Sequence, residues 1–93
     1  MSTSIKFFAD YDKEERWLNQ KAAAGFLVRK AGPFYSFSLI EPGSAVVRID
    51  YRSSMSASDF DDYVALFSDA GWQHLAGTRT SGAQYFADRK SVV

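Results

Sequence analysis

Apolar and polar residues alternate along this chain with two periods, one typical of helices and one typical of strands. Over residues 60–67 apolar side chains recur every three or four positions, which places them on one face of an α-helix. Trp17 and Leu18, followed by three alanines, repeat that spacing more weakly. Over residues 34–40 and 45–52 apolar residues alternate with serines or charged residues, as on a strand with one buried face. The pattern predicts two helices, each placed between strands.

Two stretches of the chain resemble each other. When residues 14–28 are aligned with residues 60–74, both contain alanine and glycine followed by an aromatic residue, at Gly25 and at Gly71. Glycine commonly ends a helix, and the aromatic residue then opens the next strand. The alternative is chance similarity over a short segment. We interpret the two stretches as the helices of a tandem repeat.

The predicted fold class is α+β, in a single domain over residues 1–93. It consists of two tandem strand-helix-strand-strand repeats forming one antiparallel sheet with two helices packed on one face. The pseudo-repeats cover about residues 4–40 and 45–89, with flanking strands over 5–9 and 34–40 in the first and over 45–52 and 84–88 in the second.

Turn and capping sequences refine this picture. Residues 41–44, Glu-Pro-Gly-Ser, have the composition of a type II turn and are expected to join their flanking strands as a hairpin. Asp12 with Glu15 is a capping-box spacing for the first helix. The second helix has two such spacings, Ser56 with Asp59 and Ser58 with Asp61.

Composition and charge exclude several classes of function. The chain has 93 residues, of which 46% are hydrophobic, and its 11 basic residues balance 11 acidic ones. This balance lacks the basic excess of a nucleic-acid-binding domain. Without cysteine and with one histidine, neither a disulfide framework nor a zinc site of cysteines or clustered histidines is expected. No apolar run approaches the roughly 18 residues that span a bilayer.

Catalytic and metal-binding signals are weak. His74 has only Gln73 and Leu75 as neighbours in sequence, so we interpret it as a structural or surface residue. The acidic residues near positions 10–15 and 59–62 stand where helices begin, which favours capping over cation binding. No serine lies in a nucleophile-elbow motif, and residues 77–82 lack the lysine of a phosphate loop. We expect no enzymatic activity, no metal and no cofactor.

A polar strand face carries the candidate binding site. Arg48, Asp50 and Arg52 alternate on one strand, so their side chains project from one face. Such a row suits a carboxylate or phosphate ligand, although cross-strand ion pairs on a solvated face are the alternative. Aromatic residues on neighbouring elements complete the candidate ligand-binding set, which is Phe34, Arg48, Asp50, Arg52, Trp72 and Tyr85.

Adjacent aromatic residues on three strands point to opposite sheet faces. These pairs are Phe7-Phe8, Phe34-Tyr35 and Tyr85-Phe86. One ring of each pair is expected on the side away from the helices, which indicates that this second face is covered.

Several motifs together resemble a bacterial family, the domain of unknown function 2812. They are Lys6-Phe7-Phe8, Glu14-Glu15-Arg16-Trp17-Leu18-Asn19, Ala23-Ala24-Gly25-Phe26, Tyr35-Ser36-Phe37, Glu41-Pro42-Gly43 and Arg48-Ile49-Asp50-Tyr51, with weaker matches at Tyr63, Ala70-Gly71-Trp72 and Tyr85-Phe86. The resemblance implies a cytoplasmic domain, often followed by membrane-spanning segments and often encoded beside transcription regulators. It implies no site residues.

The expected function is binding without catalysis. A sensor or regulatory module would accept a small molecule or a protein on its open sheet face, and would be associated with a membrane only through a segment outside this chain. The alternative is a structural domain that forms a homodimer through the aromatic sheet face. A looser likeness of architecture, to gyrase-inhibitor-like domains that bind aromatic or cationic ligands between two halves, is an analogy of topology alone.

Overall fold

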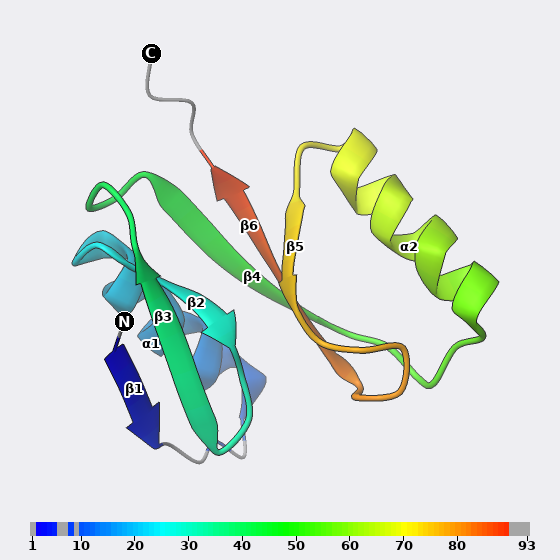
Figure 1. Cartoon of the computed structure of the whole chain (residues 1–93), viewed down its shortest axis with the longest axis horizontal. Coiled ribbons are helices and arrows are strands. Elements are labelled where there is room, and N and C mark those ends of the chain that lie inside the picture. Colours follow the sequence, from blue (N-terminus) through cyan, green and yellow to red (C-terminus); the bar gives the residue numbers. More distant parts are fainter. Residues whose placement is uncertain (1, 6–7, 9, 90–93) are drawn as a thin grey trace.

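The computed structural model describes residues 2–5, 8 and 10–89 (Figure 1). The elements in chain order are β1 (Ser2–Ile5), α1 (Tyr11–Ala23), β2 (Phe26–Lys30), β3 (Phe34–Leu39), β4 (Ala45–Tyr51), α2 (Ala57–Asp69), β5 (Gln73–Ala76) and β6 (Ala83–Arg89). This order confirms the α+β class. Of the strand predicted over residues 5–9, only Ile5 lies in β1, and residue 8 is not in a strand. Residues 6, 7 and 9 lie outside the described part of the chain.

The strands form two antiparallel sheets instead of one. Their orders are β1-β3-β2 and β4-β6-β5, and within the described residues no hydrogen-bonded ladder joins them. The two sheets approach each other where β2 lies beside β5. Each of these strands has a register shift, between Val28 and Lys30 in β2 and between His74 and Ala76 in β5. Such bulges bend and twist a strand, and both lie in the strands at which the two sheets approach each other.

The predicted hairpin between β3 and β4 is also wrong, although its turn is present. Gly43 has a φ of 75°, and the Ser44 N–H donates to the Glu41 carbonyl over 3.0 Å, as a type II turn requires. The segment is tied to the end of α1, because the Gly43 N–H donates to the carbonyl of Ala22 over 3.1 Å. β3 therefore pairs with β1 and β2, while β4 pairs with β6.

The two helices lie on different surfaces, which corrects the expectation that both cover one face. α1 packs against β2 and β4, and α2 packs against β5. Tyr85 and Phe86 are neighbours on β6 and point to opposite faces. The Tyr85 hydroxyl bonds to Glu14 of α1, whereas the Phe86 ring stacks on Phe67 of α2 with ring centres 4.2 Å apart. Figure 1 shows α1 behind the strands of the first half and α2 at the far side of the molecule.

Helix ends follow the local sequence with one exception. Ser56 caps α2 by accepting the Asp59 N–H over 3.2 Å, as predicted. α1 is capped by Asp10, which accepts the Asp12 N–H over 2.8 Å, so the predicted Asp12 box is wrong. The carboxylate of Glu15 has another partner, described below. In the described part of the chain, neither helix is long and apolar enough to cross a membrane.

The core lies between α1 and the facing sides of the two sheets. Its buried members are Leu18, Ala22, Leu27, Val28, Tyr35, Phe37, Ala45, Val47, Tyr85 and Ala87. Burial of this apolar surface is the main force that holds the sheets together. α2 contributes no buried residue. The helices therefore differ in their role, because α1 is a core element and α2 covers the outer face of one sheet.

Two side chains of α1 occupy the free edge of β4. Asn19 donates to the Val47 carbonyl over 2.8 Å and accepts the Val47 N–H over 2.7 Å. Glu15 accepts the Ile49 N–H over 2.7 Å. An edge strand exposes unpaired backbone groups that favour aggregation. The amide and the carboxylate, one helical turn apart, replace a neighbouring strand and fix α1 against the second sheet.

We expect Asn19→Ala to lower the free energy of unfolding by about 2 kcal/mol, because it leaves two half-buried backbone groups without partners. Urea denaturation measures this loss. Gln20→Ala, an exposed change in the same helix, is the control and should stay within about 0.5 kcal/mol of the parent. Equal losses in the two variants would show that Asn19 does not hold the edge.

Candidate functional site

Four of the six predicted site residues meet between β4 and α2. The Arg48 guanidinium lies 5.5 Å from the centre of the Trp72 ring. The Arg52 guanidinium lies 5.4 Å from the centre of the Tyr63 ring. Asp50 accepts hydrogen bonds from Arg52 Nε over 2.9 Å and from the Tyr63 hydroxyl over 2.7 Å. The alternating strand positions therefore do project together, toward the side of the sheet on which α2 lies.

The other two predicted residues lie elsewhere. Phe34 is on β3 of the first sheet and is 58% exposed. Tyr85 is buried and faces α1, on the opposite side of the second sheet from Arg48. The set could not converge because Tyr85 and Phe86 alternate on β6, and because β3 and β4 belong to different sheets.

Arg48, Asp50 and Arg52 form what we call the arginine face, and their charges partly compensate each other. Asp50 raises the pKa of Arg52 through its hydrogen bond and its charge. The Arg52–Asp50 pair is largely exposed, so it contributes only about 0–1 kcal/mol to stability. Arg48 forms no ion pair with any described residue. Beside these arginines, a shallow groove of about 320 Å³ is lined by Arg52, Leu66, Phe67, Ala70 and Trp72.

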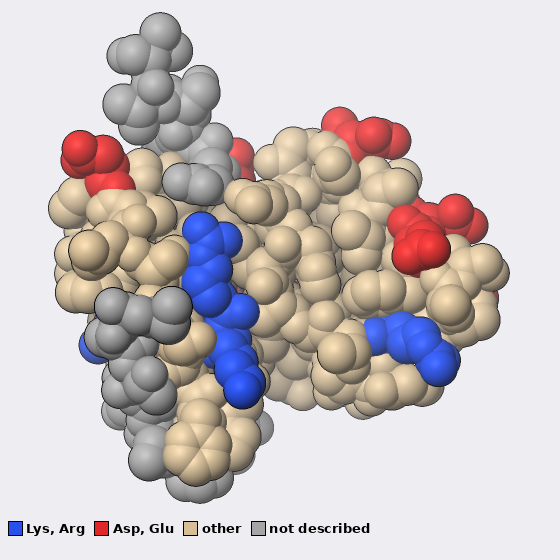
Figure 2. Space-filling model, viewed as in Figure 1, with Lys and Arg blue, Asp and Glu red and all other residues tan. Residues whose placement is uncertain are grey.

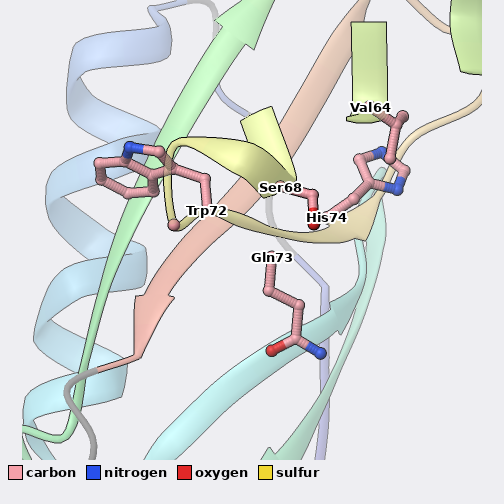
Figure 3. A pocket seen from close by; sticks show the side chains of 6 residues that line it. Val64, Ser68, Trp72, Gln73 and His74 are labelled. Atoms are coloured by element: carbon pink, nitrogen blue, oxygen red, sulfur yellow. The ribbon is translucent and has the colours of Figure 1, made fainter. Parts of the chain in front are cut away.

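His74 lies in a second open pocket on the other side of α2 (Figure 3). Val64 is next to the imidazole, while Trp72 points to the opposite side. His74 Nε2 lies 3.0 Å from Gln84 Oε1, and the ring packs edge-on against Phe86. Among the described residues no carboxylate forms a hydrogen bond with His74. The described histidine and acidic residues also form no cluster that could hold a metal ion. This geometry provides no acid–base pair.

A buried carboxylate joins the two sheets. Glu14, in the first turn of α1, is only 4% exposed. Its Oε2 accepts hydrogen bonds from the hydroxyl of Tyr35 on β3 over 2.7 Å and from that of Tyr85 on β6 over 2.6 Å. Such bonds to a charged acceptor are stronger than those between neutral groups. Glu14 is therefore in direct contact with one strand of each sheet.

The carboxylate also lines a cavity of about 250 Å³. The walls are Phe8, Tyr11, Gly32, Pro33, Tyr35, Ala83 and Tyr85. A smaller hollow of about 140 Å³ shares Gly32, Ala83 and Tyr85 with it. In the described part of the chain, no fully buried side-chain oxygen lacks a hydrogen-bond partner. Because Glu14 Oε1 accepts no hydrogen bond from these residues, it is accessible, and the cavity provides that access.

This environment makes the two tyrosines harder to ionise. Burial raises the pKa of Tyr35 and of Tyr85 far above the ordinary value of about 10, and the hydrogen bonds to Glu14 raise it further. Both hydroxyls therefore remain donors at pH values at which an exposed tyrosine ionises. Among the described residues no lysine or arginine pairs with Glu14. The site is a carboxyl group bordered by four aromatic rings and by Gly32, Pro33 and Ala83.

Sequence reasoning missed Glu14 because helix capping accounted for every acidic residue near the start of α1. A signal was present nevertheless. Glu14, Leu18 and Ala22 are spaced four residues apart and are the three buried residues of α1. A charged residue on the buried stripe of a helix requires a hydrogen-bonding partner in the core. Tyrosines on two different strands were suitable partners.

These features define a small α+β domain with a buried carboxylate between two sheets. The family model described as "Protein of unknown function (DUF2812)" matches residues 10–92, and the chain belongs to this family. That match confirms the resemblance noted from the motifs. No curated protein and no solved structure matches the chain.

Alkaline pH should unfold the protein cooperatively. In the unfolded chain tyrosine ionises near pH 10, whereas in the fold the raised pKa values of Tyr35, Tyr63 and Tyr85 keep these three residues protonated. Above pH 10 the folded state thus binds more protons than the unfolded state. The free energy of unfolding keeps its full value below pH 10 and falls as the pH rises above that value. Tyrosinate absorbance at 295 nm and far-UV circular dichroism, recorded together from pH 8 to 13, measure both events.

We expect these three tyrosines to ionise only as the dichroism signal is lost. Tyr35→Phe is the matched variant, and its unfolding should depend less steeply on alkaline pH. If all five tyrosines ionise while the dichroism stays native, the burial of these hydroxyls is refuted.

Proposed function

We propose that this protein is a non-catalytic sensor domain that binds a small organic cation bearing an aromatic group. The ligand occupies the cavity between the two sheets, with its positive charge beside Glu14. The observation that carries this proposal is the 4% exposed carboxylate that lines an aromatic cavity without a basic partner among the described residues. This site differs from the open sheet face that the alternating residues of β4 suggested.

Charge supports a cationic ligand over a neutral or anionic one. Removing a carboxylate from water is costly, and the hydrogen bonds from Tyr35 and Tyr85 offset only part of that cost. A cation beside Oε1 would supply the missing electrostatic partner. An anion would be repelled by Glu14, since no described basic residue lines the cavity.

The walls support an aromatic or alkylammonium group. Rings of Phe8, Tyr11, Tyr35 and Tyr85 border the cavity. A cation close to such ring faces gains about 0.5–2 kcal/mol from each favourable contact. Together the two adjoining hollows fall in the lower part of the range of typical ligand-site volumes. The site therefore suits a ligand with roughly one ring and a compact cationic group.

The position of the cavity supports a role in signalling. Because Tyr35 and Tyr85 belong to different sheets, a ligand that contacts Glu14 acts at the point where the sheets are joined. A ligand that prefers one relative arrangement of the sheets shifts the population toward it. We propose that this change in the arrangement of the sheets is the signal that the domain transmits. The domain would act in the cytoplasm, and in some proteins it would lie next to a membrane segment outside this chain.

We also infer that the two halves are copies of one ancestral unit. In support, both bounds of α2 lie 46 residues after those of α1, and the bulges of β2 and β5 have the same separation. Corresponding ring pairs, Trp17–Phe37 and Tyr63–Phe86, both have centres 5.8 Å apart. Alignment of relatives tests this, since their two halves should align at a similar separation.

Isothermal titration with benzyltrimethylammonium tests the proposed ligand class. We expect measurable binding to the parent and at least about tenfold weaker binding to Glu14→Gln, which retains the shape and an acceptor oxygen but removes the charge. Glu15→Gln is the matched control, because that carboxylate lies at the edge of β4 and does not line the cavity.

The probe also has matched controls. Neopentylbenzene, the uncharged isostere, and benzenesulfonate, an anion, should bind at least tenfold more weakly than the cation. Equal affinity for the cation and its isostere, or full binding by Glu14→Gln, would contradict the proposal. If the double variant Arg48→Ala with Arg52→Ala lost binding and Glu14→Gln did not, the ligand would bind at the arginine face and not in the cavity.

A further inference from the structure

A smaller hollow lies beside the cavity that Glu14 lines. Its volume is about 140 Å³, and Gly32, Ala83 and Tyr85 border both spaces. Apart from its two neighbours in sequence, no residue has a heavy atom within 4 Å of where a Cβ at Gly32 would lie, so the space at this shared wall is open. Glu14 lines the larger cavity and not the smaller hollow. The two adjoining spaces therefore differ in character, since only one of them has a carboxylate.

Backbone geometry keeps part of the wall of the smaller hollow without side chains. Ala31 and Gly32 directly follow β2, whereas Gly77 and Ser81 belong to the loop between β5 and β6. Gly32 has a φ of 133° and Gly77 a φ of 107°, values that residues with a side chain rarely adopt. Both positions therefore favour glycine, and the hollow lies between one turn from each half of the chain.

The polar side chains that line the smaller hollow already have partners within the protein. The Ser81 hydroxyl accepts the Thr78 N–H over 2.9 Å and donates to the Thr78 carbonyl over 3.1 Å. The Tyr85 hydroxyl donates to Glu14 over 2.6 Å. The other residues of the wall are alanines and glycines. An apolar group in this hollow would therefore leave no lining side chain without a hydrogen-bond partner.

We propose that the smaller hollow holds the aromatic ring of the ligand, while the cationic group lies beside Glu14 in the larger cavity. This assignment rests on the proposed cation site and adds the residues that select the ring. The volume suits one ring, because a cavity of about 150 Å³ takes up a benzene molecule. Tyr85 borders both spaces, so its ring can contact both parts of the ligand. Ala31 lines the smaller hollow alone and limits the size of the ring.

A second aromatic surface near the cavity is more exposed. Tyr11, which lines the larger cavity, and Tyr51 have ring centres 5.8 Å apart and are 46% and 61% exposed. A ligand ring stacked on this pair would remain partly in water and would bury less apolar area than a ring in the hollow. The hollow is therefore the favoured position, and variants of Ala31 and Tyr51 distinguish the two.

A series of three ammonium ions tests the size of the hollow on the parent chain. Titrations followed by NMR chemical shifts measure weak and strong binding alike. Benzyltrimethylammonium should bind at least about tenfold more tightly than tetramethylammonium, as expected for the burial of one ring. Naphthylmethyltrimethylammonium has more apolar surface, yet it should bind at least about fivefold more weakly than the benzyl ion, because two rings exceed the volume of the hollow.

Ala31→Leu should remove the preference for the benzyl ion, because the longer side chain takes up space in the smaller hollow. Its affinity for tetramethylammonium should stay within about twofold of the parent value, which also shows that the variant is folded around Glu14. Ala31→Ser, a change of similar volume, and Tyr51→Ala are the matched controls and should keep the benzyl preference. If Ala31→Leu loses both affinities, the three-ion series on the parent decides.

Acidic side chains on the surface attract any ammonium ion and require a control of their own. In Figure 2 such side chains gather over α2. Asp62 is an exposed residue of this helix. Asp62→Asn should leave all three affinities unchanged, because α2 lies on the Phe86 side of the second sheet whereas Glu14 lies on the Tyr85 side.

The outcomes separate the position of the ring from the proposed function. Equal affinities for the methyl and benzyl ions, both lost in Glu14→Gln, would support the cation site and overturn the position of the ring. A benzyl preference that is lost in Tyr51→Ala and kept in Ala31→Leu would place the ring on the exposed tyrosine pair. Tighter binding of the naphthyl ion than of the benzyl ion would also overturn the proposal. If none of the three ions binds the parent, both proposals are wrong.

Discussion

One buried carboxylate connects the parts of this fold that the backbone leaves separate. The two sheets share no hydrogen-bonded ladder among the described residues, so their relative position depends on side chains. Glu14 accepts hydrogen bonds from Tyr35 of one sheet and Tyr85 of the other, and the helix that carries it also occupies the edge of β4. α1 is consequently the element around which both sheets are arranged. The same carboxylate provides the negative charge of the proposed ligand site.

Local signals predicted the elements but not how the sheets divide. Apolar spacing, the Ser56 cap and the glycines at 25 and 71 depend on neighbours in sequence, and the structure has helices that end where expected. The separation of β3 from β4 depends on hydrogen bonds between the turn at Gly43 and the end of α1, which no alternation pattern reveals. Strand pairing over long separations is decided by packing, so a good turn sequence was insufficient evidence for a hairpin.

The candidate site was predictable only in part for a related reason. Alternation on β4 brought Arg48, Asp50 and Arg52 to one face, and Trp72 joined them because it ends the turn after α2. Tyr85 was assigned to that face because the sheet side of each β6 residue could not be derived from sequence. Glu14 was overlooked because capping already explained an acid there. Its two partners come from strands far apart in the chain, which only the tertiary structure brings together.

A double-mutant cycle between Tyr35→Phe and Tyr85→Phe measures most directly whether Glu14 joins the sheets. With either tyrosine present, one hydroxyl still bonds to the carboxylate, whereas the double variant leaves a buried charge without either donor. Unfolding in urea should therefore show a loss for the double variant that exceeds the sum of the single losses by at least about 1 kcal/mol. Losses that add within about 0.3 kcal/mol would contradict the account, because the two hydroxyls would then act independently.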